Sequence, residues 1–135
     1  MHASVVVDSN IFIGLLRRDV DPVRYLGEWI GDGDFVTCGM IRVEVERGLR
    51  VEKIRRTLGG FFSVMINVPT TNKIWEQATE MAWNLDRKGK VLPAQDILIA
   101  VSALAHGAAV LTDDGHFEEI PGLQVLKASK TLDKW

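Results

Sequence analysis

The sequence VVVDSNIFIG, residues 5–14, places a carboxylate between two apolar segments. Its three consecutive valines are typical of a strand that is buried on both faces, as the strands of parallel sheets are. Asp8 follows the valines directly, and residues 11–18 have the pattern of a short helix. A strand that passes through a polar turn into a helix is the repeating unit of α/β proteins. This stretch therefore predicts an α/β fold with Asp8 at the carboxyl end of its first strand.

Strands and helices alternate along the remaining chain as well. We expect further strands at residues 35–37, 64–68, 108–111 and 123–126. Further helices are expected at residues 23–30, 40–56, 73–87 and 95–106, with a turn or short helix at 114–120. Gly59 and Gly60 are expected to break the helix that starts at residue 40. This order predicts a three-layer α/β/α sandwich with a mainly parallel central sheet.

Length and composition limit the kind of protein. The 135 residues are expected to form one domain, residues 1–135. No apolar run reaches the ~18–20 residues of a membrane span, and the start of the chain lacks the pattern of a signal peptide. Cys38 is the one cysteine, so a cytoplasmic location is expected. The formal net charge of −2 indicates no general affinity for nucleic acid, so binding a polyanion requires a local basic patch or metal ions.

Acidic residues follow a second buried strand in the same way as Asp8 follows the first. The sequence AAVLTDD places Asp113 and Asp114 just after residues 108–111. In open α/β sheets, ligands bind outside the carboxyl ends of the strands. An Asp in this position is also a common helix N-cap or turn former, so each of these residues taken alone is weak evidence for a site.

Two glutamates in the sequence MIRVEVERGL, residues 40–49, have different helical neighbours. Glu44 shares a helical face with apolar residues, which directs its carboxylate toward the core or along its edge. Glu46 shares a face with Arg42 and Arg50, where ion pairing in solvent explains it. Only Glu44 is therefore a candidate for a functional site.

Asp96 lies near the start of the helix expected at residues 95–106, and its neighbours three, four and seven positions later are all apolar. The helix dipole favours an acid at this end by about 0.3–1 kcal/mol. An unpaired charge in an apolar setting costs several kcal/mol, so the dipole does not account for this residue.

A bound cation would resolve the conflict if these carboxylates converge. Like charges at close range raise each other's pKa values, and a divalent ion between them removes the repulsion. Ligands that are all oxygen suit Mg²⁺ or Mn²⁺ rather than zinc. Carboxylates that hold one or two such ions are a common apparatus for phosphodiester hydrolysis. The candidate metal-binding and catalytic residues are Asp8, Glu44, Asp96 and Asp114.

Four stretches in this order resemble a PIN domain, and the resemblance covers essentially the whole chain. They are VVVDSNIFIG, RVEVERGL, PAQDILIAVSALAHGAAVLTDD and HFEEIPGLQVL. The similarity is to the VapC-type toxins of prokaryotic toxin–antitoxin pairs. It implies a Rossmann-like α/β/α sandwich and Mg²⁺- or Mn²⁺-dependent endoribonuclease activity. It also implies a homodimer and inhibition by a cognate antitoxin.

The resemblance also implies roles for individual residues. The four acids of the family's site fall on Asp8, Glu44, Asp96 and Asp114. Asn10 and Thr112 match positions that hydrogen-bond a ligating carboxylate or a water. Many family members carry an acid where this chain has His116. This departure leaves open whether Asp113 or Asp114 is the ligand and how complete a second metal site is. We expect His116 to be a surface residue rather than a ligand.

Two features concern partners. Arg17, Arg47 and Arg50 belong to basic segments that are candidates for contacting an RNA backbone, although a solvated helix face explains them equally well. Trp75 and Trp83 make the helix expected at residues 73–87 apolar over a wide arc. Core packing and a dimer or antitoxin surface are both compatible with this pattern.

Other functions also fit parts of the sequence. Aspartate-nucleophile phosphoryl transfer, as in haloacid dehalogenase-like phosphatases, needs a second Asp where Asn10 stands. A two-component receiver domain would use Asp8, Thr112 and Lys127, but it needs a paired acid beside the first strand. An RNA-processing nuclease outside a toxin–antitoxin system and a non-catalytic domain that binds RNA or protein are further alternatives.

Overall fold

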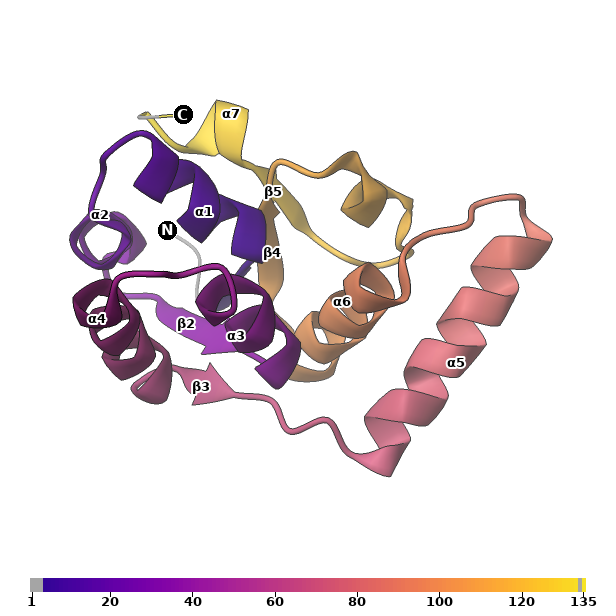
Figure 1. Cartoon of the computed structure of the whole chain (residues 1–135). Coiled ribbons are helices and arrows are strands. Elements are labelled where there is room, and N and C mark those ends of the chain that lie inside the picture. Colours follow the sequence, from indigo (N-terminus) through magenta and orange to yellow (C-terminus); the bar gives the residue numbers. More distant parts are fainter. Residues whose placement is uncertain (1–3, 134) are drawn as a thin grey trace.

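The computed structural model describes residues 4–133 and 135, and it contains a parallel sheet with helices around it (Figure 1). The strands of this sheet are β1 (Ser4–Val7), β2 (Asp34–Thr37), β3 (Ile66–Asn67), β4 (Ala109–Thr112) and β5 (Val125–Lys127). Their order is β3-β2-β1-β4-β5, and every neighbouring pair is parallel. The predicted α/β class and parallel sheet are confirmed.

The three valines of β1 explain why this strand is central. Val5, Val6 and Val7 are at most 2% exposed. Val5 is in register with Phe35 of β2 on one side and with Ala109 of β4 on the other. Because a central strand is covered on both faces, a continuous β-branched run suits this place in the sheet.

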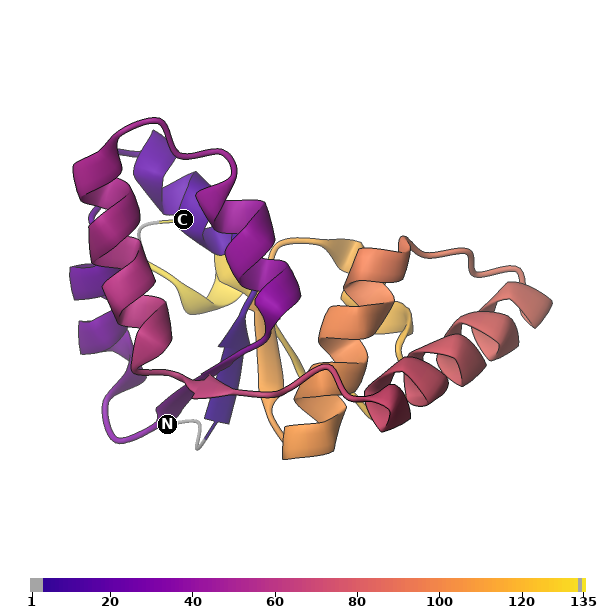
Figure 2. The same ribbon diagram turned by 60° about the horizontal axis from the view of Figure 1, so that its bottom comes forward.

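Helices flank the sheet on two sides. They are α1 (Ser9–Arg17), α2 (Pro22–Ile30), α3 (Gly39–Glu46), α4 (Glu52–Ser63), α5 (Asn72–Arg87), α6 (Ala94–His106), α7 (Ala128–Thr131) and the 3₁₀ helix η1 (Gly115–Glu119). In Figures 1 and 2, α1 to α4 lie together at one side of the sheet and α5 with α6 at the other. None of the helices in residues 4–133 has the length and hydrophobicity needed to cross a bilayer.

The helix expected over residues 40–56 is in fact two helices, so that prediction is wrong. α3 ends at Glu46, and α4 begins at Glu52. The turn between them lets Leu58 and Phe62 of α4 reach the core, where they are at most 2% exposed. The Phe62 ring packs 5.1 Å from that of Phe12 in α1.

Gly59 and Gly60 lie inside α4 instead of breaking it. Each costs a helix roughly 0.5–1 kcal/mol relative to Ala. Burial of a Leu or Phe side chain gains ~1.5–3 kcal/mol, which outweighs that cost. Smaller differences are the start of α1 at Ser9, a third strand limited to Ile66–Asn67, and the helix α7, which the sequence pattern did not indicate.

The outermost helix, α5, presents its tryptophans to solvent. Ile74, Ala78 and Leu85 are the residues of this helix that are buried. Trp75 and Trp83 are 51% and 56% exposed. The core-packing interpretation of these two tryptophans is therefore wrong.

Candidate metal centre

The sheet topology brings together acids that are far apart in sequence. Asp8 follows β1 and is the N-cap of α1, while Asp114 follows β4 and is the N-cap of η1. β1 and β4 are parallel neighbours, so their carboxyl ends meet at one edge of the sheet. Glu44 comes from α3, and Asp96 lies in the first turn of α6. These two helices pack against each other.

Asp8 is the most deeply buried of the four acids, at 4% exposure. Its Oδ1 accepts a hydrogen bond from the Ser9 backbone N–H at 2.8 Å, and its Oδ2 accepts one from the Thr112 hydroxyl at 2.8 Å. Burial raises the pKa of Asp8 to about 6, and the charges of Asp96 and Glu44 add to the rise, although both hydrogen bonds oppose it. The carboxylate is thus held in one orientation but is costly to ionise.

The Thr112 hydroxyl links two of the acids. Besides donating to Asp8, it accepts from the Asp114 backbone N–H at 3.0 Å and from Asn10 Nδ2 at 3.2 Å. The sequence predicted that Thr112 and Asn10 bond a ligating carboxylate or a water. In the structure Thr112 donates directly to the Asp8 carboxylate, whereas Asn10 is connected to Asp8 only through the Thr112 hydroxyl.

Glu44 and Asp96 also lie in an environment that disfavours their charged forms. Burial raises the pKa of Glu44, and the charge of Asp96 adds to this effect. Burial also raises the pKa of Asp96, and the charge of Asp114 contributes. Because Asp8 is coupled to Glu44 and Asp96 in turn, the four acids form one electrostatic cluster.

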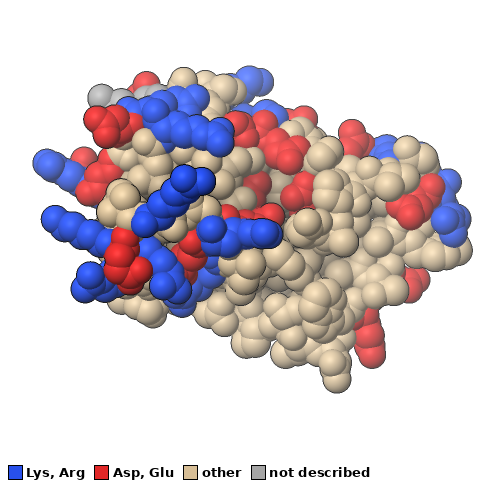
Figure 3. Space-filling view, viewed as in Figure 1, with Lys and Arg blue, Asp and Glu red and all other residues tan. Residues whose placement is uncertain are grey.

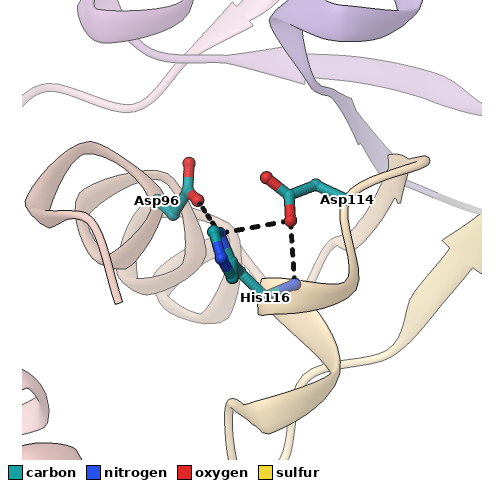
Figure 4. Close-up of side chains that lie close together, drawn as sticks. All are labelled: Asp96, Asp114 and His116. Atoms are coloured by element: carbon teal, nitrogen blue, oxygen red, sulfur yellow. Dashed lines mark hydrogen bonds and ion pairs between the residues drawn. The ribbon is translucent and has the colours of Figure 1, made fainter. Parts of the chain in front are cut away.

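His116 lies beside two of these acids, Asp96 and Asp114, as Figure 4 shows. Its Nδ1 is 2.9 Å from Asp96 Oδ2 and 3.2 Å from Asp114 Oδ1. Its backbone N–H donates to Asp114 Oδ1 at 2.9 Å. The hydrogen bond with Asp96 raises the pKa of the His116 imidazole. The side chain is 46% exposed, so it is a surface residue as expected, but its contact with two acids was missed. The departure from the family pattern at this position was the available indication.

Asp113 and Asp114 differ clearly in their surroundings. Asp113 is exposed, and its backbone carbonyl accepts a weak hydrogen bond from Lys127 at 3.5 Å. Lys127 also pairs with Glu118 at 3.8 Å. Asp114 is the one that contacts His116 and Thr112. The structure therefore places Asp114 in the cluster and engages Lys127 away from Asp8, which counts against the receiver-domain alternative.

Glu46 is not solvated, contrary to the sequence interpretation. Its side chain is 16% exposed and pairs with Arg42 at 2.9 Å and with Arg55 at 3.5 Å. The pairing with Arg42 follows the expected helical spacing. Arg55 takes the place expected for Arg50 because α4 folds back against α3. Glu46 thus belongs to an ion-pair network that is separate from the four coupled acids.

The three arginines considered for RNA binding, Arg17, Arg47 and Arg50, have exposed side chains. In Figure 3, Lys and Arg gather over the half of the molecule formed by α1 to α4, and a group of carboxylates lies beside them. Arg18 is engaged elsewhere: it lies 4.1 Å from the centre of the Trp135 ring and donates to the Gly14 carbonyl at 2.9 Å.

Two buried oxygen atoms without hydrogen-bond partners indicate whether a cation fits this cluster. Among the residues that the structure describes, Asn10 Oδ1 and Glu44 Oε1 are the buried side-chain polar atoms that lack a hydrogen-bond partner. A buried acceptor without a partner costs about 1–3 kcal/mol. A divalent ion that prefers oxygen ligands would satisfy Glu44 and offset the repulsion among the acids. The donor set therefore fits Mg²⁺ or Mn²⁺.

The sequence model of the PIN domain matches residues 5–123. This match spans most of the chain, which therefore belongs to the PIN domain family. Within the family, the chain is 31% identical over 127 residues to Ribonuclease VapC4 of Mycobacterium tuberculosis. That alignment covers 90% of this chain and 94% of the relative.

Solved structures share the fold at lower sequence identity. VapBC2 from Rickettsia felis, bound to a DNA fragment from its promoter, superposes with a TM-score of 0.76 at 21% identity, covering 92% of this chain and 98% of that one. VapBC-5 from Mycobacterium tuberculosis, a member of the VapBC family of toxin–antitoxin systems, gives a TM-score of 0.62 at 21% identity, covering 93% and 97%. These likenesses confirm the architecture.

Proposed function

We propose that this protein is a Mg²⁺- or Mn²⁺-dependent endoribonuclease that acts as the toxin of a type II toxin–antitoxin pair. The observation that carries the proposal is the cluster of four coupled acids with the unpartnered Glu44 Oε1 among them. The name of the relative, Ribonuclease VapC4, supports RNA as the substrate. Cellular RNA as the target makes the cytoplasm the proposed place of action.

Each residue of the cluster has a proposed role. The residues that would hold one or two ions are Asp8, Glu44, Asp96 and Asp114. A bound ion supplies an activated water and stabilises charge on the phosphate and the leaving oxygen. Thr112 orients Asp8 directly, and Asn10 supports Thr112. The exposed arginines on the α1–α4 side would attract the RNA backbone toward the acids.

The test is cleavage of total RNA by the purified protein, with the cut sites mapped by sequencing. We expect endonucleolytic cuts in Mg²⁺ or Mn²⁺, none in EDTA, and recovery when Mn²⁺ is added in excess. Cleavage that continues unchanged in EDTA would contradict the proposed chemistry. Absence of both Mn²⁺ binding and cleavage would favour the alternative of a non-catalytic RNA- or protein-binding domain.

A matched pair of variants tests the choice between adjacent acids. Asp114→Asn is expected to weaken Mn²⁺ binding by about 10–100-fold, because loss of a ligand should cost at least as much as loss of a group that supports one. Asp113→Asn, which removes the same charge from an exposed neighbour, is expected to change the affinity by less than about threefold, since screening weakens exposed charges. Calorimetric titration measures both. Equal losses in the two variants would show that charge alone, and not ligation, sets the affinity.

The roles of the arginines are tested through the salt dependence of RNA binding. The double variant Arg47→Ala, Arg50→Ala is expected to reduce the slope of log affinity against log salt concentration by about 1–1.5, because each lost phosphate contact removes ~0.7 on single strands. Lys73→Ala, an exposed charge on α5, serves as the control. If the slope in the double variant equals the wild-type value, Arg47 and Arg50 do not contact RNA phosphates.

An antitoxin is the proposed occupant of an apolar groove on the α1–α4 side. The groove measures about 670 Å³ and lies between the α1–α2 turn and the α3–α4 turn. Leu16 and Leu58 contribute to its walls. Val51 and Ile54, also in its lining, are 55% and 38% exposed. The solved relatives named VapBC support such a partner.

A homodimer is proposed through α5, whose Trp75 and Trp83 are exposed. The two residues are separated by two helical turns and therefore lie on one face of the helix. Exposed aromatic side chains are enriched at protein interfaces, which supports covering of this face by a second copy of the chain.

A further inference from the structure

Residues just before and just after His116 in the sequence fix the position of its backbone. Asp114 is the N-cap of η1, and its Oδ1 accepts the His116 backbone N–H. The next residue, Phe117, is 1% exposed and fixes η1 to the core. The imidazole is therefore carried on an anchored turn, and Figure 4 shows it reaching toward Asp96 from η1.

The atoms that face one another form a compact set of potential ligands. Asp96, Asp114 and His116 each offer one ligand atom, and these atoms all lie within 4.8 Å of one another. Asp96 is shared, because it is also coupled to Asp8 and Glu44. With Asp8 and Glu44, Asp96 forms a set of oxygen ligands alone. With Asp114 and His116, it forms a set of two carboxylates and one imidazole nitrogen.

We propose that His116 Nδ1 is a metal ligand, and that this nitrogen makes the centre prefer transition-metal ions such as Co²⁺ over Mg²⁺. The inference rests on the proposed metal-dependent function and specifies the ion. Mg²⁺ binds oxygen ligands and retains several waters, whereas imidazole suits transition metals. Two carboxylates with a neutral imidazole carry a charge of about −2, which matches a divalent ion. An acid at this position would instead give an all-oxygen set.

A ratio of affinities separates ligand chemistry from charge. Divalent ions carry the same charge, so a change in local charge alters their affinities in parallel, whereas loss of a nitrogen ligand lowers the affinity for transition metals selectively. His116→Asp supplies an oxygen donor and His116→Gln a neutral side chain. His106→Ala is the matched control, because His106 is exposed at the opposite end of α6 from Asp96.

The experiment measures Mn²⁺, Co²⁺ and Mg²⁺ binding to the full chain by calorimetry, with pulsed electron paramagnetic resonance of the Mn²⁺ complex. In wild-type protein and in His106→Ala we expect ¹⁴N modulation from one imidazole and a Co²⁺-to-Mg²⁺ affinity ratio of at least about 100. In His116→Asp and His116→Gln we expect the ¹⁴N modulation to disappear and the ratio to fall at least about tenfold. Circular dichroism verifies that each variant is folded.

Failure of this inference is distinguishable from failure of the proposed function. Mn²⁺ binding without ¹⁴N modulation, or with an affinity ratio that is unchanged in both His116 variants, would overturn the role of His116 and leave the four-acid centre standing. If none of the three ions binds, the metal centre and the role of His116 are overturned together.

Discussion

Asp96→Asn is expected to lower the rate of RNA cleavage at saturating Mn²⁺ by at least about a thousandfold. The substitution keeps the shape of the side chain but removes the negative charge at the position that couples Asp8 and Glu44 to Asp114. A neutral amide oxygen is a weaker ligand for a hard divalent ion than a carboxylate, so an ion that binds at high concentration would still lack a charged ligand that positions it for the reaction. A fluorescent oligonucleotide that contains the mapped cut site measures the rate.

Glu46→Gln is the matched control for that experiment. It removes one negative charge from a half-buried glutamate that pairs with Arg42 and Arg55 instead of the cluster. We expect its cleavage rate to stay within about threefold of wild type, since unpairing charges outside the site affects stability more than chemistry. If purified Asp96→Asn cleaves RNA at the wild-type rate, Asp96 takes no part in the reaction and the assignment of the site is wrong.

Asp8→Asn is expected to raise the free energy of unfolding of the metal-free protein by about 1–3 kcal/mol at neutral pH, although it should abolish cleavage as Asp96→Asn does. Burial raises the pKa of Asp8 from its ordinary 3.8 to about 6, which sets an upper bound of ~3 kcal/mol on the cost of ionising it. Asn keeps the N-cap function toward Ser9. The gain is reduced because the amide cannot accept from both Ser9 and Thr112 as the carboxylate does.

The pH dependence of this gain has a definite sign. Since the folded chain binds a proton at Asp8 more tightly than the unfolded chain does, the contribution to stability is fully present below pH ~3.8 and is lost as the pH rises to about 6. The advantage of Asp8→Asn should therefore grow across this window and level off above it. Urea unfolding in EDTA measures it. If the difference in free energy of unfolding between Asp8→Asn and wild type is constant from about pH 4 to 7, ionisation of Asp8 does not destabilise the fold.

The central sheet was predictable because its signal is local. The valines of β1 and the apolar run of β4 reveal buried strands without reference to the rest of the chain. The division between α3 and α4 was not predictable in this way, because it depends on where Leu58 and Phe62 meet the core. Glycine propensity, a local property, gave the wrong answer at Gly59 and Gly60 for the same reason.

The candidate site shows the same limit. Its acids stood out because Glu44 and Asp96 have apolar helical neighbours and because Asp8 and Asp114 both follow buried strands. Residues that are ordinary in their own segment gave no such contrast. Glu46 looked solvated because its partner Arg55 lies on another helix. His116 looked peripheral because its contact with Asp96 spans 20 positions and depends on how η1 meets α6.

The position of β1 in the middle of the sheet has a consequence for the chain while it is being made. Asp8 is synthesised early, but the Thr112 hydroxyl that orients it comes 104 positions later. At about 5–20 residues per second, roughly 5–20 s of translation separate the two. A ribosome therefore carries a chain without a complete centre until Asp114 has been added. A chain cut short before β4 keeps Asp8, Glu44 and Asp96 but lacks Asp114 and the Thr112 hydroxyl, so its centre stays incomplete.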